Sequence, residues 1–277
     1  MPLTQDAIAI FDAAVAGVQP HSLLKQVTVE EAVGSSLARY HRVVVVGAGK
    51  ASMAMAGAVE EWMRRPVDEG LVVVPHGYRH SLPESARRPR TIEVVEAGHP
   101  KPDPAGVSAT RRVLDLAQSC TKKDLLLVLL SGGGSSLWPA FADAIPLEAG
   151  RQVFVLLLHS GADIHETNTV RKHLSRISGG QLVAVAAPAT VRALVLSDVV
   201  GDDLSVIASG PTVPDGSTFD EAVAVLRKYA LWERIPGVVR QHLEAGQRGE
   251  VAETPGRESR IFNQAYTRLI GSNRDAL

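Results

Sequence analysis

The chain has a single cysteine, Cys120, among its 277 residues. One cysteine excludes an internal disulfide and a metal centre built from several thiolates, and it fits a protein that works in a reducing cytoplasm. Aromatic residues make up only 4% of the sequence. A surface of stacked aromatic rings that binds nucleic-acid bases is therefore not expected.

The sequence also lacks an excess of charge of either sign, since its net charge is -1. Without a basic tail or patch, the electrostatic basis for nucleic-acid binding is missing. No apolar run approaches the roughly 20 residues that span a bilayer, and the first residues lack the basic and apolar regions of a signal peptide. We therefore expect a cytoplasmic globular protein that binds neither nucleic acid nor a membrane.

What the sequence does contain is a long aliphatic run, Leu125–Leu130, of the kind that forms a buried strand in a parallel sheet. Serines and glycines follow it directly: Ser131, Gly132, Gly133, Gly134, Ser135 and Ser136. A loop of this composition leaves its backbone N–H groups uncovered, so it suits a phosphate or another anion. The alternative is a plain turn from strand to helix.

A second glycine turn follows the predicted strand 42–46 and precedes a predicted helix over 53–63. Its residues Gly47 and Gly49 begin like a dinucleotide-binding fingerprint, but Ser52 replaces the third glycine and no acidic residue ends the next strand. Lys50 starts the helix, where its charge opposes the helix dipole. An anionic ligand would offset that cost, and the alternative is a lysine held only in solvent.

Further candidates follow other predicted strands. Residues 78–91 are rich in arginine and proline and predict a surface loop. His99 follows the strand predicted over 92–95, and ligands of α/β proteins bind at the carboxyl ends of strands. It is therefore a candidate substrate contact, although a lone histidine is often structural. Asp198 and Asp202 follow the strand predicted over 192–196 and are candidate Mg²⁺ ligands.

Two more groups complete the candidate site. Asn168, Arg171 and Lys172 have helical spacing and predict a clamp for a carboxylate or phosphate, with a solvated basic face as the alternative. Ser209 and Gly210 belong to a second Gly/Ser-containing loop that could approach an anion.

Strands, glycine turns and helices alternate along the chain, which predicts an α/β fold. Further helices are predicted over residues 3–18, 104–118, 146–160, 218–229 and 238–245, and a last strand over 266–270. We predict a domain over residues 1–246, and a linker with the start of a truncated second domain over residues 247–277. The strand and glycine turn near the end of the sequence suggest that an α/β unit is cut there.

Taken together, these segments resemble the glycerate 2-kinase family, whose bacterial members have also been called hydroxypyruvate reductases. The resemblance follows one order along essentially the whole chain. It is carried by residues 46–52, 96–103, 131–136, 161–175, 196–203, 208–215 and 269–273.

The resemblance implies a Rossmann-like three-layer sandwich with a mostly parallel central sheet. It also implies an ATP-dependent phosphorylation of D-glycerate to 2-phosphoglycerate with Mg²⁺, in which Lys50 is the catalytic lysine. One catalytic arginine of the family belongs to a C-terminal domain that this sequence does not reach, so activity of this chain alone stays open. A homodimer is expected if apolar surface that such a domain would cover lies exposed.

Two alternatives remain at this point. The first is an NAD(P)H-dependent hydroxypyruvate reductase, which the start of the dinucleotide fingerprint favours and the missing third glycine opposes. The second is a non-catalytic remnant that binds glycerate or a nucleotide.

Overall fold

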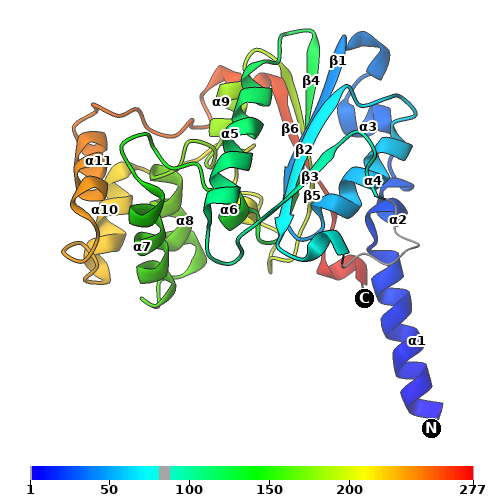
Figure 1. The fold of residues 1–277 in the computed structure, drawn as a ribbon, viewed down its shortest axis with the longest axis horizontal. Helices are drawn as coiled ribbons and strands as arrows, with labels where there is room; N and C mark the ends of the chain where they lie inside the picture. The colour runs from blue at the N-terminus through cyan, green and yellow to red at the C-terminus, as the bar shows by residue number, and fades with distance from the viewer. Residues whose placement is uncertain (1, 81–87, 277) are drawn as a thin grey trace.

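The computed structural model describes residues 2–80 and 88–276 (Figure 1). Part of the surface loop predicted over 78–91 therefore lies outside the described residues. A sheet of six strands forms the centre of the molecule, and its order is β3-β2-β1-β4-β5-β6. The strands are β1 (Arg42–Ala48), β2 (Glu69–Pro75), β3 (Glu93–Ala97), β4 (Asp124–Ser131), β5 (Thr190–Leu196) and β6 (Ala265–Gly271).

All neighbouring strands of this sheet run parallel. Parallel sheets are covered on both faces, and accordingly every residue of β4 is buried. The strand order reverses between β1 and β4. Both strands therefore end at the topological switch point, where open α/β sheets bind their ligands.

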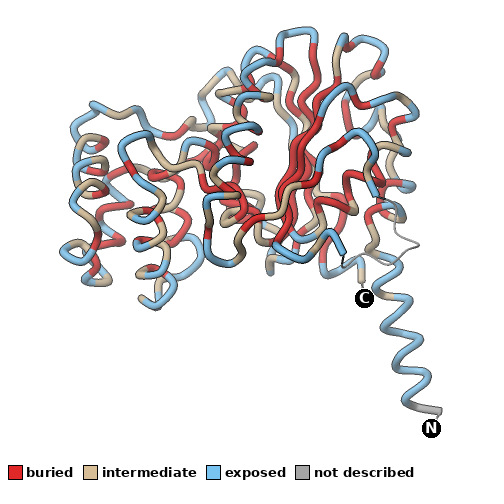
Figure 2. Tube along the Cα trace, in the orientation of Figure 1, coloured by how far each residue is buried: buried red, intermediate tan, exposed pale blue. Residues whose placement is uncertain are grey.

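Helices cover the two faces of the sheet (Figure 1). Helices α5 (Pro104–Gln118) and α9 (Gln181–Ala186) pack on the face that includes Val44 and Val46. Helices α2 (Pro20–Leu24), α3 (Val29–Val33) and α4 (Ser52–Trp62) pack on the face that includes Val43 and Val45. Figure 2 shows the buried strands between these layers. The predicted Rossmann-like three-layer sandwich is confirmed, with a sheet that is entirely parallel. We call this part the sheet body.

Four helices form a second region beside the sheet body (Figure 1). They are α7 (Leu147–Leu158), α8 (Ile164–His173), α10 (Phe219–Lys228) and α11 (Gly237–Gln247). They pack around an apolar cluster of their own, which includes Val153, Leu174, Phe219 and Leu243. We call this region the helical lobe.

The last strand corrects the predicted domain division. Strand β6 pairs in parallel with β5, from Val191 opposite Ala265 to Leu196 opposite Gly271. The sheet of the first domain thus includes residues that we had assigned to a second domain. Residues 248–264 carry the chain from the helical lobe back to the sheet body, and this return cannot be inferred from the polar composition of the segment.

The first helix, α1 (Pro2–Gly17), forms where it is predicted but does not bury its apolar stripe. Ile8 is 55% exposed and Phe11 is 67% exposed, and the helix projects away from the rest of the molecule (Figure 2). No helix in the described part of the chain combines the length and the apolar character needed to cross a bilayer.

Candidate functional site

The two glycine turns meet at the carboxyl ends of β1 and β4. The Lys50 backbone N–H donates to the Gly132 carbonyl at 2.9 Å, and the Ala51 N–H donates to Ser131 Oγ at 3.0 Å. A side chain at Gly49, which has a φ of +136°, would place its Cβ 2.2 Å from Ser131 Oγ. The glycine is therefore required for one turn to lie directly against the other. Gly47 is equally confined, because its Cβ would lie 2.6 Å from the Leu129 carbonyl oxygen.

The loop after β4 brings two predicted site residues together. A Cβ at Gly132 would lie 1.9 Å from Asp198 Oδ2, and a Cβ at Gly133 would lie 2.7 Å from His99 Nε2. His99 follows β3 and Asp198 follows β5, so both side chains reach the loop from other strand ends. The loop then enters the short helix α6 (Gly134–Leu137). The glycines thus let a histidine and a carboxylate approach the backbone closely.

The electrostatic environment of His99 keeps its ring neutral. Burial, and then the positive charge of Lys50, lower the pKa of His99 below its ordinary value, while Asp198 acts in the opposite direction. A histidine with a lowered pKa favours the neutral ring, which can accept a hydrogen bond through one ring nitrogen. Lys50 itself is exposed at the edge of the site.

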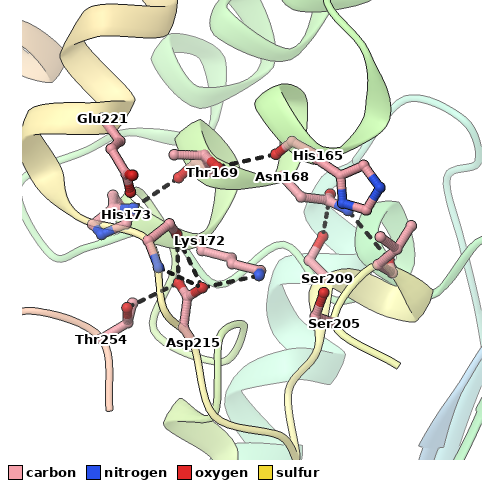
Figure 3. A network of polar contacts seen from close by, with 12 residues as sticks. His165, Asn168, Thr169, Lys172, His173, Ser205, Ser209, Asp215, Glu221 and Thr254 are labelled. Atoms are coloured by element: carbon pink, nitrogen blue, oxygen red, sulfur yellow. Dashed lines mark hydrogen bonds and ion pairs between the residues drawn. The ribbon is translucent and has the colours of Figure 1, made fainter. Parts of the chain in front are cut away.

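A second loop joins the sheet body to the helical lobe. Ala208, Ser209 and Gly210 have φ values of 51°, 58° and 61°, so three consecutive residues are left-handed. The Ser209 hydroxyl lies 2.8 Å from Ser135 Oγ and donates to Asn168 Oδ1 at 2.9 Å. Figure 3 shows this bond between the loop and α8. Ser209 and Asn168 thus hydrogen bond within the protein and hold the two loops and α8 together.

The neighbouring Lys172 does not fit the predicted anion clamp. Its Nζ donates to Asp215 Oδ1 at 3.1 Å, and both side chains are buried (Figure 3). Ser217 and Thr254 donate to the same carboxylate. Burial opposes ionisation of Asp215, yet the Lys172 charge and the Ser217 bonds outweigh it and hold the Asp215 pKa below its ordinary value. Lys172 is therefore neutralised within the protein.

Arg171 has the opposite environment, although it is the next residue. Its guanidinium lies over the ring of Phe154, 4.7 Å from the ring centroid. Burial lowers its pKa, and its buried Nε has no hydrogen-bond partner in the described part of the chain. Arg171 lines a cavity of about 220 Å³ together with His99, Gly132, Gly133, Ser135, Ser136 and Asp198.

The two predicted metal ligands are placed differently. Asp198 lines the cavity, whereas Asp202 is not among its lining residues and has a left-handed backbone, with a φ of 56°. Residues 2–80 and 88–276 contain no group of three acidic, histidine or cysteine side chains that could hold a metal ion. Magnesium beside a nucleotide needs only one or two carboxylates, because phosphates and waters fill the remaining positions. Asp198 fits that requirement.

Phe154 and Trp138 were not predicted from the sequence. Phe154 supplies the ring under Arg171, and Trp138 borders a smaller hollow behind it. Their helical or loop spacing gives no signal for a site, since apolar residues at such positions normally fill a core.

Larger hollows lie elsewhere, one of them about 620 Å³ between α5, α9 and residues 139–147. It lies away from the strand ends that carry the predicted site residues.

Comparison with known proteins identifies relatives of this chain. The glycerate 2-kinase of Pyrococcus horikoshii is 43% identical over 213 residues, which cover 77% of this chain and 46% of that protein. An Agrobacterium vitis protein, named provisionally as a hydroxypyruvate reductase, is 43% identical over 245 residues, covering 88% of this chain and 53% of that protein. The predicted resemblance is confirmed.

A solved structure shows the same fold. The crystal structure of glycerate kinase from Thermotoga maritima superposes with a TM-score of 0.82 at 37% identity, and covers 99% of this chain and 60% of that one. The chain spans about half the length of the curated relatives it matches. A family model matches residues 6–244. This match takes in most of the sequence, and the protein therefore belongs to the family described as Domain of unknown function (DUF4147).

Proposed function

We propose that this chain carries the catalytic site of an ATP-dependent kinase that converts D-glycerate to 2-phosphoglycerate. The observation that carries the proposal is the contact between the two glycine turns. Through this contact the Lys50 backbone adjoins the loop after β4 at the switch point of the sheet, which supports the proposal. The kinase names of relatives at 43% and 42% identity support the choice of reaction.

Phosphoryl transfer depends mainly on positioning and on neutralising charge. The exposed ammonium of Lys50 would stabilise negative charge on the transferring phosphoryl group. Backbone N–H groups of the Gly132–Gly133 turn would donate to substrate oxygens. The neutral His99 would accept a hydrogen bond from the glycerate hydroxyl, and its lowered pKa keeps it able to do so at neutral pH.

Magnesium would enter at Asp198. When bound, the ion would neutralise part of the charge of the nucleotide phosphates. Asp198 is exposed and lies against the glycine loop, which suits a carboxylate that shares a cation with a bound nucleotide. Asp202 is the weaker candidate, because it does not line the same cavity.

The reductase alternative has less support from the site. Ser52, at the third position of the glycine fingerprint, is fully buried, with its hydroxyl directed to the Leu129 carbonyl. Strand β2 ends at Pro75 and is followed by His76 rather than by an acid that would bind a ribose. Titration with NADH tests the alternative, since a reductase must bind it.

The test of the kinase is a coupled assay of ADP release by the 277-residue chain with ATP, Mg²⁺ and D-glycerate. Lys50→Ala should lower the rate at least about 100-fold, because a charge partner of the transition state is lost. Lys123→Ala, an exposed lysine before β4, is the matched control and should leave the rate unchanged. Near-normal turnover by Lys50→Ala would refute the assignment. Binding of D-glycerate by the wild type without ADP release would favour the non-catalytic alternative.

We also propose that the chain self-associates as a homodimer in the cytoplasm. The exposed apolar side chains Ile8, Ile10 and Phe11 of α1 support the association, and the lone Cys120 supports the compartment. Light scattering should give twice the chain mass, and Phe11→Ser should shift the population toward the monomer.

A further inference from the structure

Arg171 is a half-buried cation of this site whose Nε atom is fully buried, and it has no counter-ion among the described residues. Its guanidinium makes no ion pair or hydrogen bond with the described residues, and burial is the only cause of its lowered pKa. The adjacent Lys172, in contrast, is paired with Asp215. Removing a charge from water without giving it a partner is unfavourable. We therefore expect the half-buried guanidinium of Arg171 to bind an anion that is not part of the chain.

A second donor without an acceptor lies beside Arg171. Trp138 is 3% exposed, and its indole Nε1 has no hydrogen-bond partner in residues 2–80 and 88–276. Both Trp138 and Arg171 border a hollow of about 10 Å³ that shares Ser135, Phe154 and Arg171 with the lining of the main cavity. This volume is about that occupied by one water molecule. Trp138 Nε1 and Arg171 Nε are thus two N–H donors without acceptors that line the same hollow. Carboxylate oxygens or an ordered water would provide the missing acceptors.

The size of the main cavity restricts its occupant. Its volume is about 220 Å³, whereas pockets for drug-sized ligands measure about 300–1,000 Å³. A nucleoside triphosphate belongs to the larger class, and a three-carbon acid does not. Lys50 is absent from the described residues that line the cavity and is exposed next to it.

We propose that the cavity between Arg171 and the Gly132–Gly133 turn holds the carboxylate of a small hydroxy acid, with the nucleotide outside it on the Lys50 side of the loop. The guanidinium lies over the ring of Phe154, and His99 and Ser136 also line the cavity. The planar guanidinium can donate two parallel hydrogen bonds to a carboxylate. The identity of the acid as D-glycerate rests on the proposed function.

The test is calorimetric titration of the full 277-residue chain and its Arg171→Met variant with three probes: D-glycerate, glycerol, and a non-hydrolysable ATP analogue with Mg²⁺. The variant should bind D-glycerate at least about tenfold more weakly, as expected for loss of a charged hydrogen bond, and should bind the nucleotide within about twofold of the wild type. Glycerol, which has no carboxylate, should bind neither protein. Arg176→Met is the matched control, since Arg176 pairs with Asp143 on the exposed side.

The melting temperature of the ligand-free variant separates binding from a structural role. Removal of an uncompensated buried charge should raise it, whereas a residue that holds the fold would lower it on substitution. If Arg171→Met does not fold, Arg171→Lys takes its place, because it keeps the charge but not the planar fork. Unchanged D-glycerate affinity in the variant, or equal losses for D-glycerate and nucleotide, would overturn the proposal.

This experiment also distinguishes the proposal from the kinase function. If the wild type binds D-glycerate through Arg171 but releases no ADP with it in the coupled assay, the carboxylate site stands and the kinase assignment fails. If the wild type releases ADP with D-glycerate while Arg171→Met binds and turns over normally, the kinase stands and the carboxylate site is wrong. Failure of the wild type to bind any small carboxylate would overturn the carboxylate site.

Discussion

The sheet body and the helical lobe contribute to one site by different means. The sheet body contributes backbone, in turns where a Cβ at Gly49 would overlap the Ser131 backbone and a Cβ at Gly132 or Gly133 would displace Asp198 or His99. The helical lobe contributes side chains of α8, whose neighbours decide what each can do: Asn168 is hydrogen bonded, Lys172 is paired, and Arg171 has no acidic partner in residues 2–80 and 88–276. The backbone of the glycine turns is determined by local conformation. The roles of the α8 side chains are determined by the residues from distant segments that contact them.

The largest expected effect tests the helical lobe. Asp215→Asn should lower the free energy of unfolding by about 3–5 kcal/mol, because it leaves Lys172 buried without its partner. Urea denaturation measures the change. Asp143→Asn, which breaks the exposed pair with Arg176, is the control and should cost less than about 1 kcal/mol. Similar small losses for both variants would mean that the apolar cluster alone holds the lobe.

The next prediction tests the backbone of the sheet body. Gly132→Ala should reduce D-glycerate-dependent ADP release about 100-fold, because its Cβ would displace the Asp198 carboxylate from the loop. Gly216→Ala is the control, since its Cβ would meet no atom within 4 Å. Activity close to that of the wild type in Gly132→Ala would show that the loop and Asp198 are not closely packed.

The pH dependence of the free energy of unfolding tests the contribution of one carboxylate, that of Asp215. Because the pKa of Asp215 is lowered in the folded state, its stabilising contribution is complete above its ordinary pKa and is lost as pH falls through the folded value. The wild type should therefore lose stability below about pH 4 more steeply than Asp215→Asn, by up to about 1.4 kcal/mol per pH unit. Between pH 5 and 7 the difference between the two should stay constant. Parallel acid slopes would contradict the lowered pKa.

The smallest expected effect concerns the hydrogen bonds of Ser209, which connect the sheet body to the helical lobe. Ser209→Ala removes the hydroxyl that links Ser135 to Asn168 and should cost about 1 kcal/mol in the free energy of unfolding. Thermal denaturation measures it against Ser108→Ala, an exposed serine of α5. A loss no larger than that of the control would mean that the two loops are held by backbone contacts alone.

Much of the sheet body can be predicted from the sequence. The aliphatic run of β4 and the glycines after it have local signatures, because strand burial and tight turns depend on residue type. Helix α5 was predicted with its observed bounds, since Asp103 and Pro104 mark its start. The pairing of β6 with β5 has no local signature, and it was therefore missed.

The site residues of the helical lobe show the limit of prediction from sequence. Helical spacing grouped Arg171 with Lys172, but consecutive residues of a helix point about 100° apart. Lys172 meets Asp215, which lies 43 residues further along the chain, and Arg171 meets Phe154 of another helix. Spacing shows which residues could share a face, whereas packing decides which of them stays free for a ligand.

The left-handed run Ala208–Gly210 bears on the order in which the protein folds. A left-handed conformation costs a non-glycine residue about 1–3 kcal/mol, so Ala208 and Ser209 do not adopt it through local preference. The run is held by bonds from the Gly179 and Gly180 N–H groups to the Ser209 and Gly210 carbonyls, at 2.9 and 2.8 Å. The Ser209 hydroxyl also donates to Asn168 of α8, so we expect the second loop to take its shape only after both regions have formed and docked. A folding intermediate with a complete sheet would still lack the finished site.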